Sequence, residues 1–400
     1  MVSLGAKCSK CQSAFSSDVA LTICPECGGA LLLEYDLAQV TEQISKTILE
    51  RRDDTFWKYI ELLPLASDGV ISLQEPYTPV SPLSDRFDKA FKNAYIKDDG
   101  RLPTGTFKAR GMAVAVSCLR ELGVRRVAVP SAGNAAAALA AYGAKAGLEV
   151  YAFMPKDVPD SNLKESIFSG AKVYLVDGLI DDASRIVQTL QQKYKWFNIS
   201  TNRQPYRLEG YKAMAFEIAE QFKWDPPDNI LFPTGGGEGI IGLWKGFNEL
   251  LNLGWTNKIP RLVAVQSSGC APLVEAIVKH KSAVDEAWRH AETIAAGLRI
   301  PFPYASYLIL RAIRETEGTA VAVDDTEIAA SMKDFFKLGI YACPEAASTL
   351  AALRDLRGDR ILGRDETALL CMTGTALKHF HLLAVERSEV PILSRQADSL

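Results

Sequence analysis

The sequence predicts an α/β fold of twisted, mostly parallel sheets flanked by helices, preceded by a small cysteine-rich module. Three observations support this prediction. Short apolar runs alternate with alanine-rich amphipathic segments over most of the chain, glycines stand where several expected helices would end, and four of the eight cysteines fall within the first 27 residues. Short strands that alternate with helices are typical of βαβ units, and such units build parallel sheets.

The N-terminal module contains two Cys-x-x-Cys pairs, Cys8 with Cys11 and Cys24 with Cys27. Two such pairs can aim four thiolates at one point and complete a tetrahedral zinc site. Residues 1–34 are too few to bury a core of their own, so the metal would supply folding free energy. Four ligands leave no open coordination position, so we expect a structural zinc ion. The alternatives are a pair of disulfides or a redox-active dithiol.

The expected strands are short apolar runs, each followed by a helical segment. Gly123, Gly147 and Gly170 stand just before three of these runs, where the C-cap glycine of a preceding helix belongs. The runs cover residues 124–130, 148–155, 171–178, 229–237, 259–266 and 367–374. Together they predict βαβ units from about residue 124 to the last of these strands.

Composition excludes several classes of partner. Apolar residues make up 48% of the 400 and charged residues 23%, which is close to the average for globular proteins. A formal net charge of −3 gives no electrostatic reason to expect nucleic acid or a membrane surface. Apolar runs fall short of the roughly 18–20 residues that span a bilayer, and the first residues do not resemble a signal peptide. We therefore expect a cytoplasmic protein without nucleic-acid or membrane partners.

The first segment whose residues could take part in catalysis is PTGTFKARG, residues 103–111. Pro103 and Gly105 favour a turn, and Lys108 would open the following helix. The positive end of the helix dipole disfavours a protonated amine there, which lowers the lysine's pKa. A lysine that forms a Schiff base needs such a shift. Taken alone, an exposed lysine at a helix start is the simpler interpretation.

Two further segments place polar groups directly after expected strands, where open α/β sheets bind their ligands. In residues 131–143, Ser131 can cap a helix and Asn134 can donate a hydrogen bond to a ligand. In residues 232–239, consecutive glycines with free N–H groups precede a helix, an arrangement that favours phosphate binding. Each segment alone is also compatible with an ordinary capped helix or a tight turn.

In combination, the segments resemble those of fold type II (tryptophan synthase β-like) pyridoxal 5′-phosphate (PLP) enzymes, and most closely the threonine synthases. PTGTFKARG is similar to the lysine motif P-T-G-S-F-K-D-R-G of that family, and PTGGGEG is similar to its phosphate loop. An N-terminal four-cysteine ribbon is also familiar in this subgroup. The resemblance extends over nearly the whole chain, through residues 103–111, 131–147, 205–221, 233–239, 293–303 and 371–378.

The resemblance implies two fold type II domains and a role for each motif residue. The large PLP-binding domain would comprise residues 35–110 and 205–400, and residues 111–204 would form a small mobile domain. Lys108 would bind PLP as a Schiff base and then act as general base and acid. Asn134 would bond the cofactor's 3-hydroxyl group, and Thr373 would face its ring nitrogen. The glycines that would hold the cofactor's phosphate are Gly235, Gly236, Gly237 and Gly239. Such enzymes are usually homodimers.

The substrate of threonine synthases is O-phospho-L-homoserine, which loses phosphate and gains water to give L-threonine. A phosphorylated substrate requires a second anion site. Arg207 is the first candidate because its planar guanidinium suits bidentate phosphate binding, although an ion pair with Glu209 is the simpler alternative for this arginine. Further candidates for the same site are Ser131, Ser200, Thr201 and Lys212.

Some positions depart from the threonine synthase pattern. Ala109 replaces an aspartate, Glu238 is an unusual charge beside a phosphate loop, and residues 198–205 differ from the expected N-S-V-N run. These departures leave open a PLP-dependent serine or threonine dehydratase, or a β-replacement enzyme acting on a related phosphorylated amino acid. A catalytically silent relative that binds a partner through the ribbon is the third hypothesis. The four histidines, His280, His290, His379 and His381, are interpreted as structural or solvated.

Overall fold

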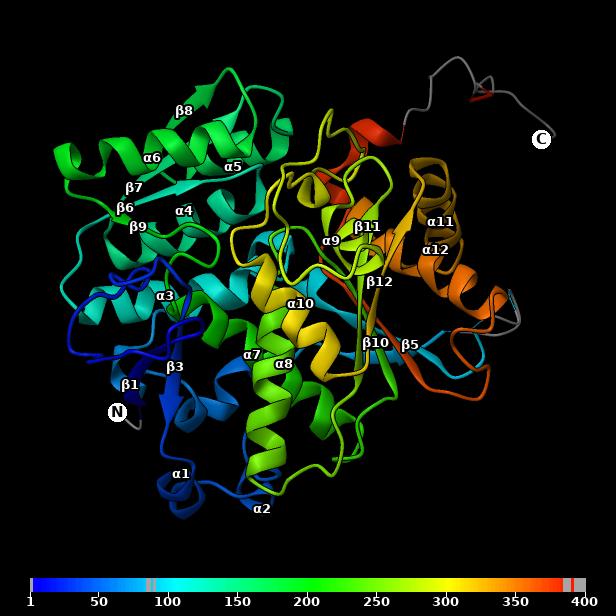
Figure 1. Cartoon of the computed structure of the whole chain (residues 1–400), viewed down its shortest axis with the longest axis horizontal. Helices are drawn as coiled ribbons and strands as arrows, with labels where there is room; N and C mark the ends of the chain where they lie inside the picture. The colour runs from blue at the N-terminus through cyan, green and yellow to red at the C-terminus, as the bar shows by residue number, and fades with distance from the viewer. Residues whose placement is uncertain (1–2, 84–87, 89–90, 384–389, 392–400) are drawn as a thin grey trace, which may run out of the picture.

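The computed structural model describes residues 3–83, 88, 91–383 and 390–391, and it confirms the α/β fold class (Figure 1). Three sheets organise the chain. A mixed sheet lies at the centre of the larger body, a parallel sheet lies beside it, and a small antiparallel ribbon lies at the N-terminus. No helix in the described ranges is long and apolar enough to cross a membrane.

The large sheet is parallel except at one edge, where its last two strands run antiparallel. In spatial order its strands are β12 (Thr319–Val323), β11 (Arg261–Ser267), β10 (Asn229–Pro233), β13 (Ala368–Met372), β5 (Ala94–Asp98) and β4 (Val80–Pro82). Three of the apolar runs expected to be strands, within residues 229–237, 259–266 and 367–374, are thus confirmed as β10, β11 and β13, while β5 and β12 were not predicted.

Both faces of the large sheet are buried, because successive side chains along a strand point to opposite faces. On β10, Ile230 and Phe232 contribute to one apolar cluster and Leu231 contributes to the other. The helices on the first face are α3 (Lys108–Glu121), α7 (Tyr206–Gln221), α8 (Glu238–Asn252), α9 (Pro272–Val278) and α10 (Ser306–Glu315). The second face is covered by α12 (Pro344–Gly358), on which α11 (Asp325–Lys337) packs.

The smaller sheet is parallel throughout. Its strands are β8 (Lys172–Val176), β7 (Glu149–Pro155), β6 (Arg126–Pro130) and β9 (Phe197–Asn198), and its helices are α4 (Asn134–Ala146), α5 (Asp160–Phe168) and α6 (Ile180–Tyr194). The predicted strands at residues 124–130, 148–155 and 171–178 are therefore confirmed. Gly147 adopts φ +70° and ends α4, as the C-cap prediction required.

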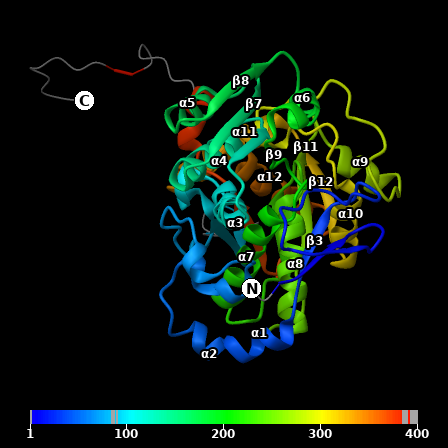
Figure 2. The ribbon, with the colours of Figure 1, turned by 90° about the vertical axis from the view of Figure 1, so that its left-hand side faces the viewer.

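The ribbon contains β1 (Ser3–Cys8), β2 (Ala14–Phe15) and β3 (Leu31–Tyr35), followed by α1 (Leu37–Gln43) and α2 (Lys46–Leu49). Figure 2 shows it lying against the helices of the large body. Leu31 and Leu33 are buried in the main core, and the Tyr307 hydroxyl on α10 accepts a hydrogen bond from Ala30 N (2.9 Å). The ribbon is therefore packed onto the large body.

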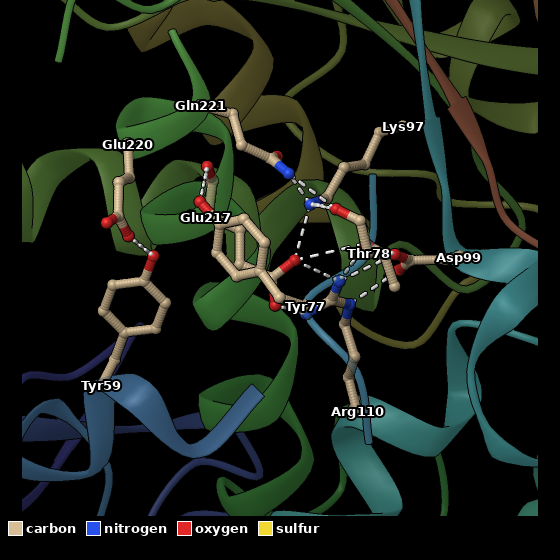
Figure 3. A network of polar contacts seen from close by, with 9 residues as sticks. All are labelled: Tyr59, Tyr77, Thr78, Lys97, Asp99, Arg110, Glu217, Glu220 and Gln221. Carbon is tan, nitrogen blue, oxygen red and sulfur yellow. Dashed lines mark hydrogen bonds and ion pairs between the residues drawn. The ribbon is translucent and has the colours of Figure 1, made fainter. Parts of the chain in front are cut away.

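A buried ionic network fixes the start of α3 (Figure 3). Arg110 donates to Asp99 Oδ2 (2.7 Å) and to Glu217 Oε1 on α7 (2.6 Å). Lys97 on β5 donates to the other oxygen of Glu217 (2.6 Å). Burial opposes ionisation of Glu217, but Arg110 and Lys97 outweigh it and lower the Glu217 pKa to about 2. Because Arg110 lies in the first turn of α3, which begins at Lys108, this network fixes the backbone that carries Lys108.

Gly210 allows α7 to cross α3 at very close range. A Cβ at position 210 would lie 2.0 Å from the Arg110 carbonyl oxygen, which no side chain tolerates. The glycine within residues 205–221 is therefore required by the contact of two backbones rather than by a turn.

Candidate active site

A cavity of about 670 Å³ is lined by residues from both α/β sheets. This volume falls within the range of pockets that enclose small ligands. The cavity lies at the carboxyl ends of β6, β10 and β13, the edge where parallel sheets place their binding loops. All residues predicted to contact PLP line it: Lys108, Asn134, Gly235, Gly236, Gly237, Gly239 and Thr373.

Lys108 is the first residue of α3, as the sequence predicted, and its side chain lines the cavity. Its Nζ lies 4.2 Å from the ring centroid of Phe107, and no carboxylate in the described residues forms an ion pair with it. Removal from water lowers the Lys108 pKa to about 8; nearby Arg207 adds to this effect, and Glu238 and Glu345 oppose it. About one tenth of this amine is therefore an uncharged nucleophile at pH 7, far more than for a lysine in water.

The glycine loop joins β10 to α8. Gly237 adopts φ +82° at the N-cap of α8, a conformation that L side chains rarely take. The backbone N–H groups of Gly235, Gly236 and Gly237 donate to no other group in the described residues. Free N–H groups at a helix N-terminus form a site for a phosphate group.

Asn134 opens α4, and its Oδ1 is buried without a hydrogen-bond partner in the described residues. A buried polar atom without a partner is costly, so the amide fits a position that a ligand completes. Ser131 Oγ accepts from Ala136 N (3.1 Å) in the first turn of the same helix, which agrees with the predicted capping role.

The segment after β13 is joined to the lysine segment by backbone contacts. Thr373 O accepts from Phe107 N (2.9 Å), and Gly105 O accepts from Thr375 N (3.0 Å). These bonds connect the Lys108 turn and the Thr373 turn, so both side chains reach the same cavity although 265 residues separate them in the sequence.

Two candidates for the substrate's phosphate lie elsewhere. Arg207 is fully buried and does not line the cavity in the described residues; its Nη2 donates to Glu238 Oε2 (2.5 Å) and its Nη1 to Ile199 O (3.0 Å). The simpler alternative, an ion pair, is what the structure contains, with Glu238 in place of Glu209 as the partner. Lys212 is also buried away from the cavity and pairs with Glu209 (2.6 Å). In contrast, Ser131, Ser200 and Thr201 line the cavity.

Sequence reasoning missed several residues of the cavity wall. Glu345 accepts from Gly297 N (2.7 Å) and its Oε2 lies 3.9 Å from His379 Nε2. His379 is buried and lines the cavity, so it is not solvated, while its interpretation as a structural residue stays a prediction. Burial lowers the His379 pKa and favours the neutral ring. Arg203 and Tyr304 also line the cavity. In the sequence, the only signal for Arg203 is its position two residues after Thr201, and Tyr304 has no such signal.

The sulfur atoms of the N-terminal cysteines form one cluster. Cys8, Cys11, Cys24 and Cys27 are free thiols, and their sulfur atoms all lie within 4.8 Å of one another. Four zinc-bound sulfurs at about 2.3 Å from the metal stand about 3.8 Å apart in a tetrahedron. The donor set and its spacing therefore fit a zinc ion.

The comparisons with known proteins agree with this geometry. Residues 71–374 match the family described as pyridoxal-phosphate dependent enzymes. The chain belongs to this family. It is 38% identical to a threonine synthase of Methanosarcina acetivorans over 93% of this chain and 91% of that protein. It is 36% identical to a threonine synthase of Methanocaldococcus jannaschii over 96% and 95% of the two chains.

Solved structures show the same PLP-dependent fold. Maize serine racemase superposes with a TM-score of 0.65 over 76% of this chain and 93% of that one, at 21% identity. A PLP-dependent aspartate racemase superposes with a TM-score of 0.64 over 83% and 96%, at 23% identity. At such identities the likeness concerns the fold alone.

The residues present fit PLP. Lys108, with its pKa lowered to about 8, is available for covalent attachment. Within the described residues, the glycine loop offers unused N–H donors for a phosphate, and Asn134 Oδ1 has no partner. Since these features line one cavity, the family's cofactor is matched in each of its main recognition elements.

Proposed function

We propose that this PLP-dependent enzyme is a threonine synthase that converts O-phospho-L-homoserine and water into L-threonine and phosphate. The observation that carries the proposal is the Lys108 amine, which has no ion-pair partner among the described residues, in a cavity shared with Asn134, the glycine loop and Thr373. The near full-length similarity to threonine synthases supports the choice of reaction.

Lys108 would hold the cofactor and, once released by the substrate's amino group, move protons on the substrate. With a pKa of about 8, its free amine removes the proton from Cα and returns protons later in the reaction. PLP supplies an electron sink for the negative charge that develops on the substrate carbons. The neutral hydroxyl of Thr373 does not hold a ring nitrogen protonated, which favours elimination of phosphate over transamination.

Both α/β parts of the chain contribute residues to the cavity wall. Residues 111–204 supply Ser131 and Asn134, and the large body supplies the glycine loop and Thr373. Residues 111–204 were predicted as a small mobile domain and residues 35–110 and 205–400 as the large one. We propose that the part of 111–204 that follows α3 moves against the large domain and closes on bound substrate, while α3 stays packed on α7. We further propose that the enzyme acts as a cytoplasmic homodimer, in keeping with its resemblance to the family.

We propose that the ribbon of residues 1–34 binds a structural zinc ion through its four cysteines. Elemental analysis of purified protein should find about one zinc per chain. Removal of zinc by a chelator should lower the melting temperature, because metal binding contributes to folding. Protein isolated without zinc, with all eight cysteines titrating as thiols and an unchanged melting temperature, would refute this assignment.

The reaction is tested by measuring phosphate release from O-phospho-L-homoserine and identifying threonine in the same mixture. Equal amounts of both products support threonine synthase. Absence of both from folded, PLP-loaded protein would overturn the proposal. Formation of a 2-oxo acid from threonine or serine would then favour the dehydratase alternative.

A further inference from the structure

We propose that Arg203 recognises the phosphate of the substrate, and that Tyr304, anchored on the cysteine ribbon, holds Arg203 in position. This inference rests on the proposed function, because only a phosphorylated substrate requires an anion site in addition to the glycine loop. It assigns the site to a residue outside the motifs that carry the family resemblance.

A phosphate dianion in a partly enclosed cavity requires a cationic partner. The positively charged side chains that line the cavity, within the described ranges, are Lys108, Arg185 and Arg203. Lys108 is reserved for the cofactor. The side chain of Arg185 is 73% exposed and pairs with Asp182 (3.0 Å), so its charge is already matched and solvated. Arg203 is half-buried and forms no ion pair with a carboxylate of the described residues.

Arg203 belongs to the same turn as two hydroxyl groups on the cavity wall. The turn follows β9 and is closed by a hydrogen bond from Arg203 N to Ser200 O (3.1 Å). Ser200 and Thr201 line the cavity beside Arg203. The Ser200 hydroxyl already donates to Asn198 Oδ1, whereas the Thr201 hydroxyl can donate to a phosphate beside the guanidinium. A hydroxyl next to a guanidinium adds a directed donor to the charge.

The guanidinium of Arg203 is positioned by an aromatic ring. Its Cζ lies 4.0 Å from the ring centroid of Tyr304, which also lines the cavity. Contact with a ring face orients a guanidinium without consuming its N–H donors. The planar edge of Arg203 therefore remains available for a bidentate bond to phosphate.

Tyr304 is in turn held by the ribbon. Its hydroxyl donates to Gly28 O, and Gly28 lies directly after Cys27 in the second cysteine pair. Gly28 N donates to Cys24 O (2.9 Å), so the carbonyl that receives the Tyr304 hydroxyl is part of the cysteine turn itself. The ribbon thus supports one wall of the cavity through a single side chain.

Arg207 does not compete for this role. Its guanidinium is committed to Glu238 and to the Ile199 carbonyl, and its charge is neutralised inside the protein. Extracting it would leave Glu238 buried and unpaired, which is strongly unfavourable. Arg203 meets no such obstacle.

The test compares two amino acids on PLP-loaded enzyme. 2-Amino-5-phosphonopentanoate replaces the bridging oxygen of the substrate by a methylene group and cannot lose phosphate, and 2-aminohexanoate lacks the phosphonate. Dissociation constants follow from the change in cofactor absorbance. We expect Arg203→Gln to weaken binding of the phosphonate about 10- to 100-fold and to leave 2-aminohexanoate unchanged.

Three further variants sharpen the assignment. Arg203→Lys keeps the charge but loses the planar bidentate donors of the guanidinium, so it should bind the phosphonate more tightly than Arg203→Gln and less tightly than wild type. Tyr304→Phe keeps the ring and removes the bond to Gly28, and it should weaken phosphonate binding about threefold to tenfold without affecting 2-aminohexanoate. Arg185→Gln is the matched control and should change both constants by less than about threefold.

The outcomes separate this inference from the proposed reaction. If wild-type protein forms threonine but Arg203→Gln binds the phosphonate normally, Arg203 is not the phosphate residue and the proposed function stands. If wild-type protein forms no threonine but prefers the phosphonate in an Arg203-dependent manner, the anion site stands and the reaction is a different one. Wild-type protein without any preference for the phosphonate would overturn the inference.

Discussion

Lys97 and Lys108 are both largely removed from water, but their surroundings are opposite. Lys97 on β5 donates to Glu217 Oε2 (2.6 Å), to Thr78 O (2.7 Å) and to Gln221 Oε1 (2.8 Å). These bonds use all the donors of its ammonium group (Figure 3). Lys108 at the start of α3 has two aromatic rings as its neighbours and no carboxylate partner in the described structure.

The difference shows how one chain assigns two roles to the same residue type. A complete set of acceptors fixes the position of Lys97, although burial lowers its pKa against the opposing effect of Glu217. Lys97 therefore serves the packing of β5 against α7. The lack of acceptors destabilises the charge on Lys108 and makes the neutral amine accessible. Burial lowers the pKa of both lysines, so a lowered pKa alone does not mark the reactive one. Lys108 is marked because it also lines the cavity and has no carboxylate partner in the described residues.

The largest expected effect is loss of chemistry on replacing Lys108. Lys108→Ala removes both the attachment point for PLP and the proton carrier, so turnover should fall by about 10³- to 10⁴-fold. The cofactor's absorbance band should disappear after dialysis, while the melting temperature of the protein without cofactor should not fall. A band that survives dialysis would show that another amine binds the cofactor.

Replacing Lys97 should affect stability instead. Lys97→Met leaves Glu217 with one cation fewer in a buried network, and we expect the free energy of unfolding to fall by about 3 kcal/mol. Urea denaturation measures this change. The matched control, Lys92→Met, removes an exposed ion pair with Asp365 and should cost less than about 1 kcal/mol. Equal losses in the two variants would contradict the structural role of the network.

The pKa of Lys108 predicts a smaller, pH-dependent effect on the protein without cofactor. Folding lowers this pKa from about 10.4 to about 8, so the unfolded chain binds more protons between these values. The cost of burying the charged amine is complete below pH 8 and disappears as the pH rises towards 10.4. Lys108→Met should therefore be more stable than wild type at pH 7, by up to about 3 kcal/mol, and the difference should shrink by pH 10. A constant difference would contradict the lowered pKa.

Much of the fold could be predicted because it depends on local patterns. The strands β6, β7, β8, β10, β11 and β13 fall within or almost within the apolar runs expected for them, and α3 begins at Lys108 as expected. In contrast, β5 carries Lys97 and Asp98 at its end and does not look like a buried strand in sequence. The buried charge of Lys97 is matched by Glu217 on α7, more than a hundred residues later, and Asp98 pairs with Arg101.

The cavity residues that belong to motifs could be predicted from the sequence. The contacts between charged residues far apart in the sequence could not. The lysine, asparagine and glycine segments all line the cavity, because each one follows a strand or opens a helix. The pairing of Arg207 with Glu238 joins two segments 31 residues apart, and the approach of His379 to Glu345 joins two others. Sequence gives the type of each residue, but only the packing of α7 against α8 decides which acid neutralises which base.

The crossing of α3 and α7 at Gly210 has a practical consequence for redesign. Because two backbones meet there at a distance that excludes any side chain, the lysine helix cannot be shifted to accept a larger substrate. The turn of residues 200–203 is held to Gly236 O by the Asn202 amide (2.8 Å) and is not wedged between helices. Libraries that seek new substrates should therefore vary this turn and leave the helix crossing untouched.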